Sequence, residues 1–236
     1  MALPKLNDSP IYDVIVPSSG QIIKFRPFLV KEQKVLLVAF ESQDDNQLIN
    51  AMVDTVNSCC TNLDANKITK IDVDYIFTMI RAKSVGENVT LVGSCENCNE
   101  QMTFEFNLNN LKLPEFKSRH QTIELTDDLK VVMKVPTYLD ITSNSTLQED
   151  ASPQVALTRM VISCMESIQT KDENMLLNDE TLEEKQNFID YLTIDQFDKI
   201  TSFISDMPSI IFNVEGDCQK CGTKNKKSME GINNFF

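Results

Sequence analysis

The sequence has little of what most active sites are built from. It contains one histidine, His120, in the polar segment KSRHQT, and only six glycines among 236 residues. A histidine in such a connection is more often solvated or structural than a general base. No Walker, dinucleotide-binding or GxSxG pattern occurs, and few glycines are available for a loop that cradles phosphate. We therefore expect a protein that is not an enzyme.

Positive charge and long apolar runs are also scarce. Acidic side chains outnumber basic ones by 35 to 22, so the formal net charge is −13, and no basic face is evident. Such a chain would repel a phosphate backbone, and we expect no nucleic-acid partner. The start MALPKLNDSP lacks the features of a secretory signal, and no apolar run is long enough to span a bilayer. A cytosolic protein is expected.

What the sequence does have is cysteine. Seven cysteines, an odd number, in a chain without an export signal favour reduced thiols over a disulfide framework. Two CxxC pairs stand out, Cys95 with Cys98 in SCENCNE and Cys218 with Cys221 in DCQKCGT. Zinc takes four thiolates tetrahedrally, so the two pairs together predict a structural zinc site. Asn99 and Gly222, which follow the pairs, tolerate the left-handed backbone that such turns often need.

Other uses of these thiols fit the sequence less well. A thioredoxin-like CxxC opens a helix, whereas the strand-like segments NVTLV, QMTFEFNL and SIIFNVEG flank the pairs here. Four thiolates would also close the coordination sphere and leave no site for a catalytic water. Four unligated thiols remain the alternative, because common zinc ribbons do not separate their pairs by a segment as long as residues 99–217. The remaining cysteines lie in helical patterns and are expected in the core: Cys59, Cys60 and Cys164.

Hydrophobic periodicity predicts an α+β fold. A hairpin is expected over residues 11–28, and another over 121–135 with its turn at Thr126–Asp128. The pattern from Pro136 to Pro208 is helical, with Pro153 in a first turn. Two capping boxes are expected in that segment, one pairing Thr181 with Glu184 and the other Thr193 with Gln196. Three earlier helices are expected over 30–42, 44–60 and 72–86, with Asp44 and Asp72 as caps.

This pattern divides the chain into two expected regions. Residues 1–88 would form the N-terminal hairpin and its helices. Residues 89–236 would form a split, zinc-ribbon-like module with knuckles at 95–98 and 218–221, carrying an α/β insertion over 110–208. A shared ion would tie together the two ends of that insertion.

Two arginines and the C-terminal segment are candidates for contacts. Arg26 in KFRPF and Arg81 in MIRAKSVGE lie among apolar residues, so each is expected either to pair with a carboxylate or to cover core surface with its stem. The ending GINNFF carries Phe235 and Phe236, which would fold back onto the domain or dock into another protein. We favour docking.

Several segments resemble the baseplate hub protein family of T-even-like contractile-tailed phages. They are KFRPFLVKEQKVLLVAFES, IDVDYIFTMIRAKSVGE with the CxxC after it, the second CxxC, and the ending GINNFF. The likeness spans most of the chain and is strongest in residues 20–100. It includes Arg26 to Phe28, Arg81 to Ser84, the four paired cysteines and the terminal phenylalanines.

The resemblance implies a non-enzymatic structural or assembly protein of the baseplate hub. Its partners would be other hub or tail proteins, met in the host cytoplasm during assembly and, for a permanent component, in the virion tail baseplate. The alternative is a transient tail-assembly chaperone that is absent from the mature particle. The oligomeric state is left open. The candidate partner-binding residues are Arg26, Phe28, Arg81, Phe235 and Phe236.

Overall fold

The chain folds into two compact units. The computed structural model describes residues 9–42, 44–113, 115–116, 118–144 and 152–231. Unit 1 takes its described residues from Met1–Ala65, Ile71–Glu115 and Ser209–Phe236, and unit 2 takes them from Asn66–Lys70 and Phe116–Pro208. The boundary expected at residue 88 and the insertion expected over 110–208 stay predictions. None of the helices in these ranges is both long and apolar enough to cross a membrane.

Unit 1 begins with the expected hairpin and helices. Strands β1 (Tyr12–Ile15) and β2 (Ile22–Phe25) pair antiparallel and are followed by three helices, α1 (Val30–Glu41), α2 (Asp45–Cys59) and α3 (Lys70–Val85). The core holds fully buried side chains from the hairpin and from α2 and α3, among them Phe25, Val56, Ile76, Phe77 and Ile80.

One of the two predicted caps is confirmed. Asp44 caps α2, because its carboxylate accepts hydrogen bonds from the backbone N–H groups of Asn46 and Gln47. The prediction for Asp72 is wrong, since α3 already begins at Lys70. Asp72 is instead buried in the first turn of α3 and accepts hydrogen bonds from the backbone N–H (2.7 Å) and hydroxyl (2.6 Å) of Ser18. It ties the β1–β2 turn to the helix.

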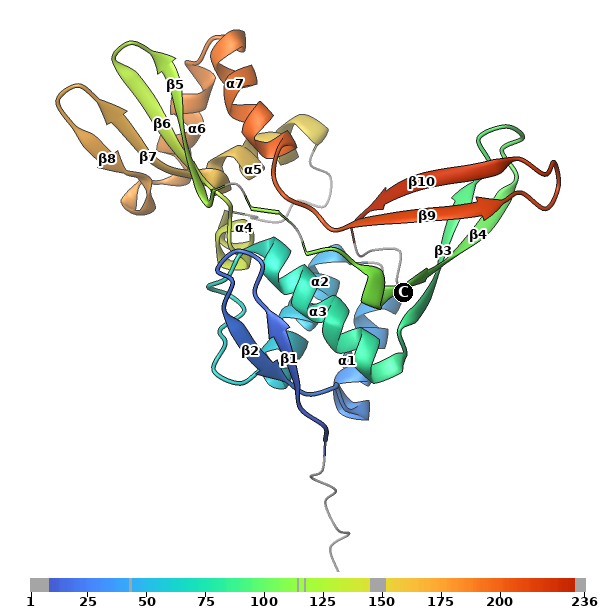
Figure 1. The fold of residues 1–236 in the computed structure, drawn as a ribbon. Coiled ribbons are helices and arrows are strands. Elements are labelled where there is room, and N and C mark those ends of the chain that lie inside the picture. Colours follow the sequence, from blue (N-terminus) through green and yellow to red (C-terminus); the bar gives the residue numbers. More distant parts are fainter. Residues whose placement is uncertain (1–8, 43, 114, 117, 145–151, 232–236) are drawn as a thin grey trace, which may run out of the picture. The chain divides into compact units, whose positions relative to one another are not determined.

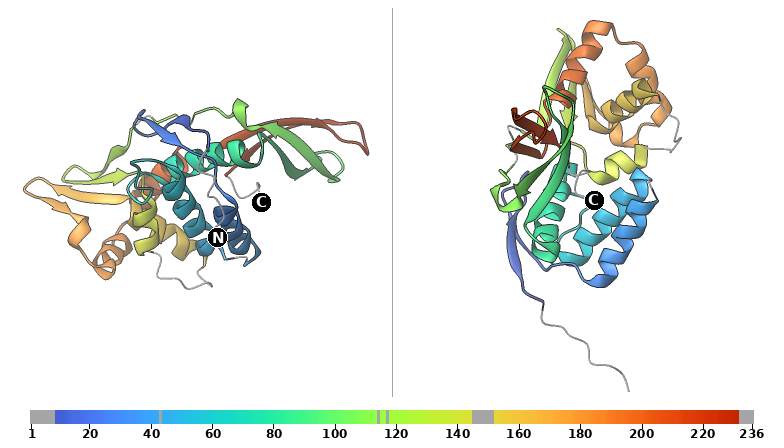
Figure 2. Two further views of the ribbon diagram at one scale, coloured as in Figure 1. Left: turned by 90° about the horizontal axis from the view of Figure 1, so that it is seen from below. Right: turned by 90° about the vertical axis from the view of Figure 1, so that its right-hand side faces the viewer.

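Unit 1 is completed by two further hairpins that pack on each other. Strands β3 (Asn88–Ser94) and β4 (Gln101–Asn107) form one antiparallel pair, followed by a 3-10 turn at Leu108–Asn110. Strands β9 (Ile211–Asp217) and β10 (Lys224–Glu230) form the other. The hairpins lie side by side in every view (Figures 1 and 2). The side chains buried on their strands include Val89, Leu91, Met102, Phe104, Phe212 and Val214.

Unit 2 is a four-stranded antiparallel sheet with helices packed on it (Figure 1). The strands are β5 (His120–Thr126), β6 (Leu129–Lys134), β7 (Met165–Thr170) and β8 (Asn174–Leu176), in that order across the sheet. The helices are α4 (Tyr138–Asn144), α5 (Pro153–Cys164), α6 (Leu182–Asp190) and α7 (Ile194–Ser205), with a 3-10 turn at Leu177–Asp179. Residues of sheet and helices share one core, which includes Val131, Met133, Val161 and Ile200.

Local signals located the helices of unit 2 but missed two strands. Pro153 opens α5, and both capping boxes are present, with Thr181 and Thr193 as the caps. The prediction that the segment up to Pro208 is entirely helical is wrong, because β7 and β8 lie within it. In β7 one of the inward positions is taken by Ser167, which is buried. Because a polar residue stands at this buried position, the alternation of apolar and polar residues that identifies a strand is not visible in the sequence.

The ring of Phe104 is held between two glycines of the paired hairpins. A Cβ added at Gly216 would lie 3.1 Å from Cδ1 on one edge of the ring, and one added at Gly93 would lie 3.0 Å from Cε2 on the other. The ring is buried and has a backbone segment at each edge. It therefore cannot move away from one glycine without approaching the other.

Replacing Gly216 by Ala should accordingly destabilise the protein. We expect a loss of about 1–3 kcal/mol in the free energy of unfolding, because the new methyl group overpacks a ring that has no space to shift. Chemical denaturation would measure the loss. Glu215→Ala, at the exposed neighbouring position on β9, is the control and should change stability by no more than about 0.5 kcal/mol. A stabilised Gly216→Ala variant would contradict this description of the contact.

Candidate metal centre

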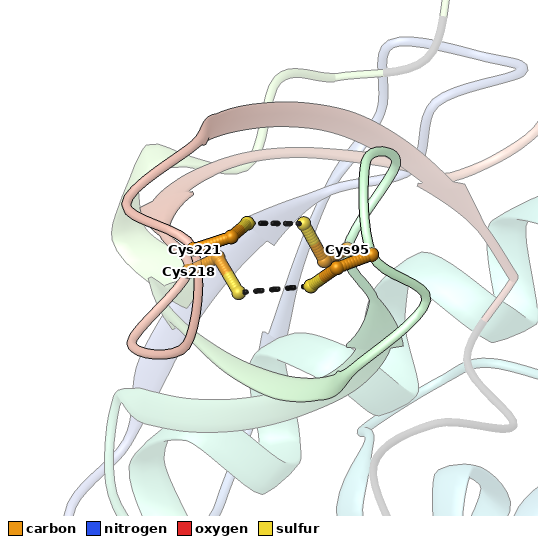
Figure 3. Close-up of side chains that lie close together, drawn as sticks. Cys95, Cys218 and Cys221 are labelled. Carbon is orange, nitrogen blue, oxygen red and sulfur yellow. Dashed lines mark hydrogen bonds between the residues drawn. The ribbon is translucent and has the colours of Figure 1, made fainter.

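The four paired cysteines meet at the tips of the two hairpins of unit 1. Cys95 and Cys98 lie in the turn between β3 and β4, and Cys218 and Cys221 lie in the turn between β9 and β10. Figure 3 shows the side chains of the two turns pointing toward one another. Asn99 (φ 55°) and Gly222 (φ 73°) adopt left-handed backbone after each pair, as the sequence predicted.

The sulfur atoms are spaced for a shared ion and not for disulfides. Cys95 Sγ lies 3.6 Å from Cys221 Sγ, and Cys98 Sγ lies 3.6 Å from Cys218 Sγ. All four sulfurs are within 4.8 Å of one another. A disulfide would bring two sulfurs to about 2.0 Å. Zinc–sulfur bonds of about 2.3 Å in a tetrahedron separate the sulfurs by about 3.8 Å, so the observed spacing fits four ligands around one ion.

Backbone N–H groups of the turns prepare these sulfurs to carry negative charge. The N–H groups of Cys98 and Asn97 lower the pKa of Cys95, although burial opposes them. At Cys221, hydrogen bonding to the hydroxyl and backbone N–H of Thr223 lowers the pKa to about 5. This is the expected environment of a metal-binding thiolate, because hydrogen bonds to the charged form favour that form.

Cys98 shows why a cation is favoured at the centre of the cluster. The backbone N–H of Glu100 lowers the pKa of this thiol, but burial and its three cysteine neighbours raise it, to about 12. Several thiolates this close repel one another, so at least one sulfur keeps its proton unless a positive ion lies between them. A divalent cation removes that repulsion and allows all four sulfurs to serve as ligands.

Asn225 on β10 connects the two turns, a role that the sequence patterns did not predict. Its side chain is 1% exposed. The carboxamide oxygen accepts a hydrogen bond from the backbone N–H of Glu96 at 2.9 Å, and Nδ2 donates to the Thr223 carbonyl at 2.9 Å. Nδ2 also lies 3.6 Å from Cys95 Sγ. A signal was present, because asparagine is disfavoured in strands and here stands four residues after Cys221.

Arg26 forms one of the two kinds of contact expected for it. Its guanidinium donates to Glu32 Oε1 at 3.0 Å, and to the carbonyl oxygens of Pro27 (2.9 Å) and Ser58 (3.0 Å). Glu32 is buried and also accepts a hydrogen bond from the backbone N–H of Leu29. The Arg26–Glu32 pair therefore fixes the start of α1 within unit 1.

The other described candidates, Arg81 and Phe28, contact the C-terminal part of α3 and the residue after it. Arg81 donates to the Gly86 carbonyl at 3.3 Å, and burial lowers its pKa. Phe28 is half-buried, and its backbone N–H donates to Ser84 Oγ. A partner-binding role for Arg26, Phe28 and Arg81 stays a prediction. The predictions for Phe235 and Phe236 concern positions outside the described residues.

His120 lies at the surface beside one carboxylate. Its side chain is exposed on β5, and its Nε2 lies 3.5 Å from Glu166 Oε2. Among the residues that the structure describes, the four cysteines form the one cluster of three or more potential metal ligands. The four-cysteine cluster is thus the candidate site that the geometry of the described residues defines.

Comparison with known proteins agrees with the resemblance seen in the sequence. The family described as T4 bacteriophage base plate protein matches residues 9–236, so the chain belongs to that family. The chain is similar to the baseplate hub assembly protein gp26 of Enterobacteria phage T4. The two are 24% identical over 229 residues, which cover 95% of this chain and 96% of the phage T4 protein. No solved structure matches the chain.

Removing the side chain of Asn225 should weaken the contact between the turns. We expect Asn225→Ala to lower the free energy of unfolding by about 1–3 kcal/mol, because the N–H of Glu96 loses its buried acceptor. Asn213→Ala is the matched control, since Asn213 is exposed on β9 and bonds only the hydroxyl of Ser228 in the described structure. Urea denaturation would compare them, and equal losses would count against a special role for Asn225.

Proposed function

We propose that the chain is a non-enzymatic structural or assembly protein of the baseplate hub of a contractile-tailed phage. The family match over residues 9–236 carries this proposal. The similarity to a baseplate hub assembly protein along nearly the whole of both chains supports the assignment to the hub. An exposed histidine and a four-cysteine cluster without a position for substrate agree with a role in assembly. Its partners would be other hub or tail proteins, met in the host cytoplasm.

The proposal includes a structural zinc ion held by Cys95, Cys98, Cys218 and Cys221. Four thiolates favour zinc, and they fill a tetrahedral coordination sphere. The two cysteine-bearing hairpins would then form a split zinc ribbon. The ion would join turns on either side of residues 99–217, so its binding energy would contribute directly to the folding of unit 1.

Metal analysis of the purified protein tests the zinc ion. We expect one zinc per chain by elemental mass spectrometry, and loss of the metal together with lowered stability in Cys218→Ser. Cys60→Ser is the control, because Cys60 is a buried thiol outside the cluster and its variant should retain zinc. Full stability with zinc retained in Cys218→Ser would reject the site. Iron in place of zinc would keep the site and reject the proposed metal.

Counting copies of the chain separates a hub component from a transient chaperone. Quantitative mass spectrometry would be applied to purified mature phage and to purified baseplate intermediates. A small integer number of copies per mature baseplate is the expected result for a permanent component. Presence in the intermediates alone would favour the chaperone, and absence from both would reject the proposed function.

A further inference from the structure

Helix α1 turns most of its apolar side chains toward solvent. Its buried positions are limited to Glu32, Leu36 and Ala39, which follow one another at helical spacing. Val30 and Val38 are each 66% exposed, although a surface helix normally carries polar residues on its outer side. An apolar surface of this kind marks a place where another element packs.

Three of the exposed apolar residues and one lysine lie together on one side of α1. Val30, Lys34, Leu37 and Val38 are spaced i, i+4, i+7 and i+8, which places them on a single side of the helix. A partner helix reads such a stripe through anchors three, four and seven residues apart. We call these four residues the α1 stripe. It has the length and the pattern of a helix-binding surface.

A groove beside the stripe gives this surface a concave edge. The groove lies between α1 and α2 in unit 1 and has a volume of about 260 Å³. Its walls are formed by two apolar residues, Val35 and Ala51, and by the polar or charged residues Lys31, Glu32, Asp54, Thr55 and Ser58. Val35 is more than half exposed, so the apolar surface of α1 continues into the groove. A docked helix could therefore place an edge of mixed polar and apolar side chains in the groove, beside its contacts with the stripe.

The stripe carries the positive charge of Lys34, and Glu41 follows on the same side at the end of the helix. Lys34 stands in the middle of the stripe and pairs with no carboxylate among the described residues. Lys31 lies 3.3 Å from Glu32, whose carboxylate is already held by Arg26. The chain as a whole has a formal net charge of −13. A cation centred in an apolar stripe on an acidic protein selects for a partner that brings an acidic residue.

We propose that the α1 stripe binds an amphipathic helix of another baseplate protein, with an aspartate or glutamate of that helix placed against Lys34. The proposal rests on the proposed function, because that function supplies a protein partner. A second copy of this chain fits less well. Two α1 helices packed about a two-fold axis near their middle would place one Lys34 ammonium group against the other.

The test uses phage that carry the full chain as wild type or as one of four variants. Val38→Glu and Lys34→Glu alter the stripe. Ile194→Glu, at an exposed isoleucine of α7, and Lys112→Glu, at an exposed lysine outside the helices, are matched controls for the same changes. Copies of the chain in purified baseplate intermediates would be counted by mass spectrometry. Thermal denaturation of each purified variant would check that it folds as the wild type does.

Both stripe variants should lower the copy number by about tenfold or more, and both controls should keep it, because the new glutamate would be buried against apolar side chains or would face the partner's own carboxylate. In wild-type intermediates, a carbodiimide should couple the Lys34 amine directly to a carboxylate of another baseplate protein. Wild-type copy number in Val38→Glu would overturn the proposal while leaving the proposed function intact. A Lys34 crosslink to a second copy of the chain would also overturn it. Absence of the wild-type chain from both the intermediates and the mature phage would reject the proposed function, and the proposed partner with it.

Discussion

One cysteine-bearing hairpin packs on the other, and this contact joins two distant parts of the sequence. The sheet and the helices of unit 2 lie between those two parts in chain order. At this contact the ring of Phe104 is enclosed by two glycines, and Asn225 hydrogen-bonds to both turns. Without this contact between the hairpins, β9 and β10 would form an isolated hairpin, and an isolated hairpin is only marginally stable in water. The closure of unit 1 therefore depends on contacts between residues far apart in sequence.

The four thiols add a requirement that apolar packing does not satisfy. The hydrogen bonds at Cys95 and Cys221 favour thiolates, whereas the high pKa of Cys98 reflects burial and the proximity of the other sulfurs. The apolar part of the contact brings the sulfurs together, and their mutual repulsion favours a cation among them. The two effects act at the same place, which links the fold of unit 1 to the chemistry of the site.

Features encoded by neighbouring residues could be predicted from the sequence, and those encoded by distant residues could not. The cap at Asp44, the boxes at Thr181 and Thr193, and the two CxxC turns all depend on residues a few positions apart. Asp72 was misassigned because its partner, Ser18, is 54 positions away. Asn225 was missed because it reaches a cysteine 130 positions away. The pairing of the cysteines was nevertheless predictable, because zinc chemistry relates the two motifs whatever their separation.

Unit 2 lies between the two hairpins in the sequence, and this order along the chain also sets an order of events during synthesis. The ribosome completes β3, β4 and the first two cysteines, then all of unit 2, before it makes β9 and β10. Until then Phe104 lacks the β9 backbone at one edge of its ring, and the first CxxC turn lacks its partner. Domains fold as they emerge, so unit 2 can form while unit 1 is still open. A chain released early would expose an apolar strand surface and two reactive thiols, which quality-control proteases and chaperones recognise as unfinished.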